Sequence, residues 1–478
     1  MIHPEKTEFL KGKAANLLVP VMLTFMADEL TPISLFYSLE GERKFLLESA
    51  ENGKRWGRYS LLGCNPYRTI YSSGDRVTIE EKGKTTVSQG QLLQIVEQLM
   101  PSVQDHGSGE MPPFMGGGIG YLGYDYSRQY EKIPDQNFDQ LQTPEACLMF
   151  YQEVMIYDHY HHLVHLVYNV RPDQDITYEA VVERLKLRQS RLRTRNQLHP
   201  LAASEGPLRI RAGCTKEQFC DKVRKAKEHI QEGDAFQVVL SQRFTIETSA
   251  DPFVAYRKLR GLNPSPYLFY IDFGTYQVVG ASPESLVCVQ DKLVKTNPIA
   301  GTRPRGQNPE ADARMKEELL SDAKELAEHV MLVDLGRNDL GKVACFGSVK
   351  VERWLEVDFY SHVMHLVSTV TGQLRPDRTG FDALIACLPA GTVSGAPKIS
   401  AMTIIDDLEE VRRGIYAGAV GYLAYTGNLD MCIAIRTIVF KDGQAYVQAG
   451  AGIVYDSVPE MEYQETLNKA MALKEVLA

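Results

Sequence analysis

The chain has 478 residues, of which 44% are hydrophobic and 24% are charged. This is the composition of an ordinary globular protein, and the length allows two or three domains. Aspartate and glutamate outnumber lysine and arginine, so the formal net charge is −9. That balance lacks the basic surface typical of nucleic-acid binding and excludes nucleic acid as an expected partner.

The ends and the cysteines of the chain indicate where it works. The first residues lack the apolar segment of a secretory signal, and no apolar run approaches the roughly 20 residues that span a bilayer. The eight cysteines are scattered and form no CxxC pair, which is typical of reduced thiols. We therefore expect a cytoplasmic protein with no membrane partner.

Short β-like runs separated by turns fill the first third of the chain. A basic, polar stretch at 186–207 then interrupts this pattern. We place a boundary near residue 205, between an N-terminal domain (1–205) and a C-terminal domain (206–478). The β-like runs lie at 34–41, 44–50, 58–63, 151–158 and 162–170, of which the last two predict a hairpin.

The second part of the chain begins with a well-signalled helix. Thr215 and Gln218 have the spacing of a capping box, and Gly233 ends a run with apolar residues at helical intervals. After several strands, one long helix is predicted over 311–335, and a last helix over 459–477. Strands grouped between helices, without a regular βαβ winding, predict an α+β fold.

Two local patterns look like binding motifs but lack the necessary context. Residues 118–123 read GxGxxG, yet no apolar strand precedes them and no helix follows, so tight turns and close packing are the better interpretation. The grouped histidines also lack a supporting cysteine or carboxylate, and alternate strand residues face opposite sides. We interpret as a solvated hairpin the segment that contains His159, His161, His162 and His165.

Two pairs of carboxylates have a spacing suited to a cation. Glu325 and Glu328 lie three residues apart in the predicted long helix, and Glu462 and Glu465 repeat this spacing in the last helix. Each pair therefore lies on one helix face, which by spacing alone is more often a solvated charged face. Two facing helices that each offer a carboxylate would suit Mg²⁺, which prefers oxygen ligands and keeps waters that a substrate oxyanion can replace.

Three glycine-rich runs, at 298–306, 388–398 and 447–454, lie between predicted elements. They are either ordinary turns or parts of an anion site, because glycine allows backbone N–H groups to approach an anion closely. The basic residues nearby that favour a carboxylate-binding pocket are Arg303, Lys398 and Arg436.

Long motifs in a fixed order carry a family resemblance across almost the whole chain. These motifs occupy 45–49, 263–269, 280–284, 298–306, 318–341, 362–368, 388–398, 413–423, 432–437 and 448–470. Together they resemble the chorismate-utilising enzymes, most closely the large subunits of anthranilate synthases. The resemblance implies two large antiparallel β-sheets packed together with helices outside. It also implies a reaction in which ammonia attacks C2 of chorismate, the C4 hydroxyl leaves, pyruvate is eliminated and the ring aromatises, the first committed step of tryptophan synthesis.

The resemblance further implies roles for individual residues. Glu328 and Glu465 resemble the Mg²⁺ ligands, and Glu284 resembles the acid that protonates the leaving C4 oxygen, which requires a raised pKa. His365 resembles a histidine of the elimination step, with a core histidine as the alternative. The residues that resemble substrate contacts are Gly301, Thr302, Tyr416, Arg436, Gly450, Ala451, Gly452 and Lys469.

Two positions separate this chain from sister enzymes. Isochorismate and salicylate synthases resemble each other in a water-activating lysine, where this chain has Gln237. Aminodeoxychorismate synthases, which belong to the folate pathway and are the alternative function, typically have a lysine where this chain has Ala300. Both differences favour anthranilate synthase. The residues that resemble a feedback site for tryptophan are Ser49, Pro266, Tyr267 and Leu268.

The sequence also predicts a partner. None of the cysteines lies in a Gly-x-Cys-x-Gly nucleophile setting, so we expect a separate glutamine amidotransferase small subunit to supply ammonia. A non-catalytic, tryptophan-sensing protein on the same scaffold is the hypothesis from another class. It predicts the loss of Glu284, Glu328 or Glu465, and all three are present.

Overall fold

Two antiparallel β-sheets organise the chain, which confirms the predicted α+β class. The computed structural model describes all residues except 51–56, 105–110, 194–199, 202–207, 360–362 and 478. The first sheet has the order β1 (Ile2–His3), β2 (Val19–Met26), β11 (Leu163–Val170), β10 (Glu153–Asp158), β4 (Tyr59–Gly63), β3 (Phe45–Glu48), β14 (Tyr267–Asp272), β15 (Tyr276–Ser282), β24 (Thr437–Lys441), β25 (Gln444–Ile453), β13 (Gln237–Glu247) and β12 (Arg209–Ala212), and β21 (Gly395–Ala396) also pairs with β13.

The second sheet is built in the same way. Its order is β18 (Ile299–Pro304), β20 (Val363–Gln373), β17 (Leu293–Thr296), β16 (Ser285–Gln290), β23 (Leu429–Ile433), β22 (Ala419–Ala424), β8 (Gly117–Leu122), β9 (Ala146–Phe150), β5 (Arg68–Ser73), β6 (Arg76–Glu81) and β7 (Lys84–Gln89), and β19 (Lys350–Phe359) also pairs with β20.

Alternating side chains explain how the sheets pack on each other. In β14, Phe269 and Ile271 belong to the core shared by the two sheets, whereas Leu268 and Tyr270 face the other way, toward helices. This alternation follows from the two-residue period of a strand. Tyr121 of the second sheet and Tyr276 of the first share a hydrogen bond of 2.8 Å between their hydroxyls, within this shared core.

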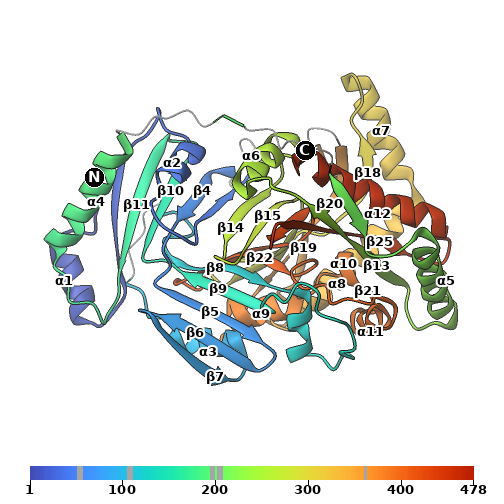
Figure 1. Cartoon of the computed structure of the whole chain (residues 1–478), viewed down its shortest axis with the longest axis horizontal. Helices are drawn as coiled ribbons and strands as arrows, with labels where there is room; N and C mark the ends of the chain where they lie inside the picture. The colour runs from blue at the N-terminus through green and yellow to red at the C-terminus, as the bar shows by residue number, and fades with distance from the viewer. Residues whose placement is uncertain (51–56, 105–110, 194–199, 202–207, 360–362, 478) are drawn as a thin grey trace.

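Helices cover the outer faces of both sheets. Figure 1 shows α1 and α4 along one end of the molecule and α5, α7 and α12 at the opposite end. The helices are α1 (Lys6–Ala14), α2 (Pro32–Ser38), α3 (Leu92–Leu99), α4 (Tyr178–Arg193), α5 (Lys216–Glu232), α6 (Pro252–Leu262), α7 (Pro309–Ser321), α8 (Ala323–Gly341), α9 (Gly380–Cys387), α10 (Gly391–Ser394), α11 (Lys398–Leu408) and α12 (Pro459–Lys474).

Strands from both sides of the predicted domain boundary mix in both sheets. β3 pairs with β14 in the first sheet, and β8 pairs with β22 in the second. Residue 205 itself lies outside the described residues, so the division into 1–205 and 206–478 stays a prediction.

Several local predictions are confirmed. The Thr215–Gln218 capping box begins α5, and β10 and β11 form the predicted hairpin. Close packing of the GxGxxG glycines is confirmed, because a Cβ on Gly120 would lie 1.9 Å from the carbonyl oxygen of Cys147; residues 118–122, however, lie in β8 and not in turns, and a short 3-10 helix, Tyr124–Gln129, follows. His161 and His162 lie exposed in the hairpin turn, whereas His165 is buried against Thr24.

Three local predictions are wrong. The long helix over 311–335 is two helices, because the Asp322 side chain accepts hydrogen bonds from the first amides of α8 and caps it. Residues 34–38 are helical because Thr31 and Ser34 form a capping box and Pro32 occupies the first turn of α2. The basic stretch begins inside α4, which continues to Arg193.

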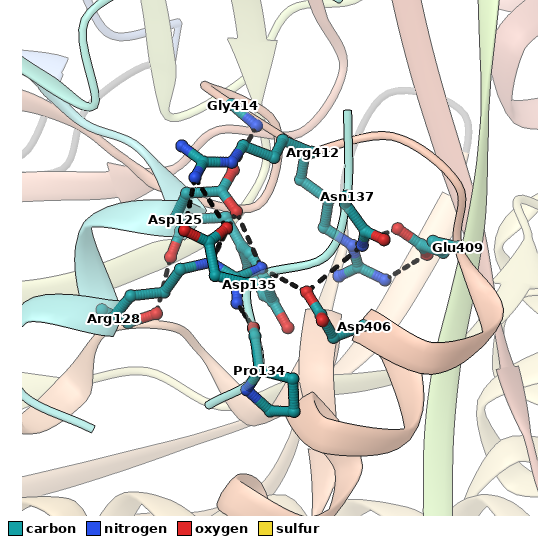
Figure 2. Close-up of polar contacts among 12 residues, drawn as sticks. Asp125, Arg128, Pro134, Asp135, Asn137, Asp406, Glu409, Arg412 and Gly414 are labelled. Carbon is teal, nitrogen blue, oxygen red and sulfur yellow. Dashed lines mark hydrogen bonds and ion pairs between the residues drawn. The ribbon is translucent and has the colours of Figure 1, made fainter. Parts of the chain in front are cut away.

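A polar junction ties residues 125–137 to the end of α11 (Figure 2). Arg128 bridges Asp125 at 3.1 Å and Asp406 at 2.6 Å. Beside it, Glu409 binds Arg413, which is almost completely buried, at 2.6 Å.

The eight cysteines are free thiols. Across the described ranges, no helix combines the length and the apolar character needed to cross a bilayer.

Candidate active site

The predicted carboxylates come together from two helices. α8 packs on β18 and β20, whereas α12 packs on β25 of the other sheet. Burial raises the pKa of Glu328, and the negative charges of Glu325 and Glu465 raise it further. Burial also raises the pKa of Glu462, again with a contribution from Glu465. Carboxylates that raise one another's pKa form a concentration of negative charge that a cation would relieve.

This oxygen-rich group fits Mg²⁺ better than a metal with a closed protein cage. Mg²⁺ is commonly held by one or two carboxylates and otherwise by water and substrate, so a loosely spaced pair is sufficient. Within the described part of the chain, the only tight group of three possible ligand atoms belongs to His229, Glu232 and Asp234. That group lies exposed at the end of α5, where His229 already binds Asp234 at 2.8 Å, and we assign it no metal.

Lys469 connects the carboxylates to β25. Its Nζ atom lies 2.6 Å from Glu465 and donates a hydrogen bond of 3.0 Å to the carbonyl oxygen of Gly450. Arg436 in turn donates to the carbonyl oxygen of Lys469 at 3.4 Å. Arg436 thus brings positive charge to this place, and Lys469 shares its charge with Glu465. Arg303 and Lys398 are engaged by Glu318, Asp322, Glu325 and Asp339.

The end of β25 offers backbone amides on one side. β24 pairs with β25 only as far as Val447, so the residues beyond have β13 on one side alone. Because the carbonyl of Gly450 is directed to Lys469, the alternation of an antiparallel strand directs the amides of Gly450 and Gly452 away from β13. The same alternation turns the amide of Ala451 toward β13.

Tyr416 explains why residue 450 is glycine. A Cβ on Gly450 would lie 2.9 Å from the Tyr416 hydroxyl, closer than a side chain tolerates. Burial raises the pKa of Tyr416 to about 12, so its hydroxyl keeps its proton and can donate it in a hydrogen bond. Burial lowers the pKa of the neighbouring Arg436, and the Tyr416 and Glu465 side chains counteract this effect.

His365 lies beside Gly301 and Thr302 across the β18–β20 pair. Its Nδ1 atom is 3.0 Å from the carbonyl oxygen of Gly301 and 3.0 Å from the Thr302 hydroxyl. Burial lowers the pKa of His365, so the imidazole is mainly neutral near pH 7. Gly301 has a φ of +66°, where β18 bulges, and glycine adopts this conformation without strain.

Glu284 is a buried carboxyl at the turn between β15 and β16. Its exposed fraction is 9%, and burial raises its pKa to about 8. The Thr392 hydroxyl and the Lys469 ammonium counteract part of that rise. The side chain therefore carries a proton at neutral pH, which meets the requirement for a general acid.

Two residues of the site were not predicted as site residues. Gln237 donates a hydrogen bond of 3.3 Å from Nε2 to Glu328, and its own carbonyl oxygen is buried without a partner among the described residues. Thr392 lies near Glu284 in the glycine-rich run at 388–398. The quoted motifs contained Thr392, but only the fold places it beside a carboxyl.

A second cavity contains all four residues predicted to bind tryptophan. It has a volume of about 350 Å³, lies where β3 meets β14, and is lined by Ser49, Pro266, Tyr267 and Leu268 among others. The Ser49 hydroxyl is buried and has no partner among the described residues. The carboxylate of Glu48 is already bound by Ser60 and Arg260. The other carboxyl in the lining, Asp430, accepts a hydrogen bond from the Tyr267 hydroxyl, and burial raises its pKa to about 7.

Comparisons with known proteins agree with this geometry. The model of the chorismate binding enzyme family matches residues 42–475. Anthranilate synthase component 1 of Acetivibrio thermocellus is 48% identical over 99% of this chain and 98% of its own, and that of Pseudomonas aeruginosa is 45% identical over the same shares. The chain belongs to the anthranilate synthase component 1 branch of the chorismate-binding enzymes.

Solved structures of this family share the fold. The crystal structure of anthranilate synthase component I from Streptococcus pneumoniae is 42% identical, covers 94% of this chain and 98% of its own, and superposes with a TM-score of 0.81. MenF, an isochorismate synthase from Escherichia coli, has a TM-score of 0.71 at 19% identity over 99% of this chain and 98% of its own, which shows the fold alone. Component 1 relatives at 41–48% identity do not favour the aminodeoxychorismate alternative.

The burial of Glu284 has a consequence for stability. The carboxyl keeps its proton up to about pH 8 in the folded protein, but its ordinary pKa is 4.5. As pH rises through this window, the folded state holds a proton that the unfolded state releases, so the free energy of unfolding falls by up to about 1.4 kcal/mol per pH unit. Glu284→Gln cannot ionise and should lose this part of the pH dependence.

Urea unfolding of both proteins at the two ends of that window measures the difference. The stability of Glu284→Gln relative to the original protein should increase from the acidic end to the alkaline end. Glu460→Gln, at an exposed position on α12, is the matched control and should leave the pH dependence unchanged. Parallel pH profiles for Glu284→Gln and the original protein would show that Glu284 titrates normally.

Proposed function

We propose that this chain is the chorismate-using subunit of an anthranilate synthase, which converts chorismate and ammonia into anthranilate, pyruvate and water. The observation that carries the proposal is the buried, protonated carboxyl of Glu284, on which the Lys469 ammonium acts. Lys469 in turn binds Glu465, one of the paired carboxylates of α8 and α12. The branch of the family to which the chain belongs supports the same reaction.

Chorismate has two carboxylates, and the site offers two kinds of partner for them. Arg436 presents a planar guanidinium that can meet the enolpyruvyl carboxylate bidentately, with the Tyr416 hydroxyl beside it. The amides of Gly450 and Gly452 and the Lys469 ammonium form a second anion-binding edge. Gly301 and Thr302, which lie in the other sheet, are proposed to contact the substrate near its ring carboxylate.

The family resemblance implies Mg²⁺, and the side chains fit it. Glu328 of α8 and Glu465 of α12 would hold the ion, with Glu325 and Glu462 beside them. When bound, Mg²⁺ acts as a Lewis acid and template for the ring carboxylate. Gln237 orients Glu328 through its hydrogen bond.

The chain's own acid and histidine then act on the ring. Ammonia attacks C2, and Glu284 gives its proton to the oxygen that leaves C4. In the second step the ring loses its proton at C2 and pyruvate leaves from C3. Neutral His365, close to Gly301, is proposed to assist this elimination.

The chain is also proposed to have a partner subunit, an inhibitor and a cytoplasmic location. A glutamine amidotransferase small subunit is proposed to supply ammonia, and L-tryptophan is proposed to inhibit by binding the cavity at Ser49. Eight free thiols agree with a cytoplasmic location.

The decisive experiment is product identification with the purified chain. Chorismate, Mg²⁺ and an ammonium salt should give fluorescent anthranilate and an equal amount of pyruvate, whereas glutamine in place of ammonium should give neither. Activity should rise with pH as ammonium becomes ammonia and fall above the pKa of Glu284 at about 8, because the acid is then lost. Aminodeoxychorismate as the product, or full activity with glutamine alone, would refute the proposal.

The metal assignment has its own test. Glu328→Gln or Glu465→Gln should lower kcat/KM at limiting Mg²⁺ by on the order of 100-fold or more, because each removes a proposed ligand. Glu460→Gln, exposed on the same helix as Glu465, is the matched control and should behave as the original protein. Titration of Mg²⁺ into each variant gives the apparent metal affinity. Unchanged Mg²⁺ dependence in both ligand variants would remove them from the metal site.

Tryptophan control follows from the position of the 350 Å³ cavity. Its wall combines Ser49 after β3, from the first part of the chain, with Pro266, Tyr267 and Leu268, from the second. A ligand that contacts both parts favours one arrangement of the two, and it can shift the balance only by its differential affinity. Chorismate and tryptophan must then weaken each other's binding by the same factor.

Ser49→Phe should give an enzyme that is active and insensitive to tryptophan, because the larger side chain occupies the cavity. The measurement is anthranilate formation over a tryptophan titration. Ser88→Phe, on the exposed edge strand β7, adds the same side chain elsewhere and should leave inhibition intact. Normal inhibition of Ser49→Phe would exclude Ser49 from the site.

A further inference from the structure

A small cavity adjoins Glu284. Its volume is about 40 Å³, and Glu284 lines it together with residues of β16, α8 and the 387–392 segment. A water molecule needs about 10–15 Å³, so the space is large enough for water. It is far too small for chorismate, which must lie elsewhere in the site.

The lining of this cavity includes the polar residues Thr296, Thr392 and Asp339 and the apolar residues Leu332 and Leu335. The Thr392 hydroxyl lies close enough to Glu284 to lower its pKa. The hydroxyl is buried, and within the described part of the chain it has no partner at ordinary hydrogen-bond geometry. Buried polar groups normally have partners, and a water that bridges the two would satisfy both.

From this geometry we infer that the cavity is a binding site for the water that is formed at C4 of the substrate. The inference rests on the proposed function, which places the leaving oxygen at Glu284. Glu284 is the one proposed catalytic residue that lines the cavity, so the newly formed water and this space share a carboxyl.

Atoms and protons balance in the amination step when the water leaves into this cavity. As the C2–N bond forms, the two ring double bonds shift by one position and the C4–O bond breaks, leaving its electron pair on oxygen. That oxygen takes the Glu284 proton and becomes water. The nitrogen loses one proton overall, which replaces the proton that Glu284 gave. A separate site for water keeps the product away from the face where ammonia attacks.

The aminated intermediate provides a direct test, because it divides between two fates. Its return to chorismate requires water at C4, whereas its conversion to anthranilate and pyruvate requires none. The intermediate is added to the Mg²⁺-loaded enzyme without ammonia, and the initial ratio of chorismate to anthranilate is measured. Filling the cavity should lower this ratio by about tenfold or more, because one reactant loses its position beside the bond it must form.

Ala390→Val is the filling variant. Ala390 lines the cavity and has an extended backbone, which valine adopts readily. Ala386→Val, four residues earlier in α9 and not in the lining, is the matched control and should keep the original ratio. Leu332→Phe, in α8, is the second filling variant and is used if Ala390→Val does not fold. An unchanged ratio in a folded filling variant would overturn the inference.

A crystal structure of the original protein gives an independent measurement. We expect an ordered water in the cavity within hydrogen-bonding distance of Glu284 and Thr392, and its loss in Ala390→Val. A dry cavity would overturn the inference even if the ratio moved. If the intermediate gives no anthranilate with the original protein, the proposed function fails instead, so the two failures are distinguishable.

Discussion

The buried ion pair between Glu409 and Arg413 holds together the elements that surround the candidate active site. Arg413 donates to Glu409 and to the carbonyl oxygens of Val393 and Val239, at distances of 2.6 to 2.9 Å. Glu409 also accepts hydrogen bonds from the backbone and the hydroxyl of Ser241. One pair thus connects α11, α10 and β13. Loss of either partner would leave a buried charge unpaired, which typically costs about 3–5 kcal/mol.

The same ion pair contacts the site through the ring of Tyr416. The guanidinium of Arg413 lies 5.7 Å from the centre of the Tyr416 ring. The Tyr416 hydroxyl lies where a Cβ on Gly450 would be only 2.9 Å away, so the Tyr416 ring lies between Arg413 and β25. The side chains of Arg436 and Lys469 thus lie together beside the end of β25, although the whole protein carries a net charge of −9.

Burial assigns different tasks to carboxyls of the same chemical type. Glu284 is surrounded by the protein and keeps its proton, whereas Glu465 pairs with Lys469 and lies half exposed, which suits a charged metal ligand. In the 350 Å³ cavity at Ser49 the same rule applies to Asp430, whose pKa is raised by burial and whose carboxyl accepts a hydrogen bond of 2.9 Å from the Tyr267 hydroxyl. That cavity lies where β3 pairs with β14. From β14 the first sheet continues through β15 and β24 to β25.

The sequence by itself determined the local elements and the family. The Thr215–Gln218 capping box, the hairpin of β10 and β11 and the long ordered motifs are properties of neighbouring residues, and the structure and the comparisons confirm them. Local pattern was insufficient where a single residue redirects the chain, as Asp322 does by capping α8. Only the tertiary structure decided which groups meet. Strand pairing joins Glu48 to Leu268, more than two hundred residues later, and burial that depends on distant segments sets the pKa of Glu284. Spacing cannot reveal such contacts, because desolvation and charge act through space and not along the chain.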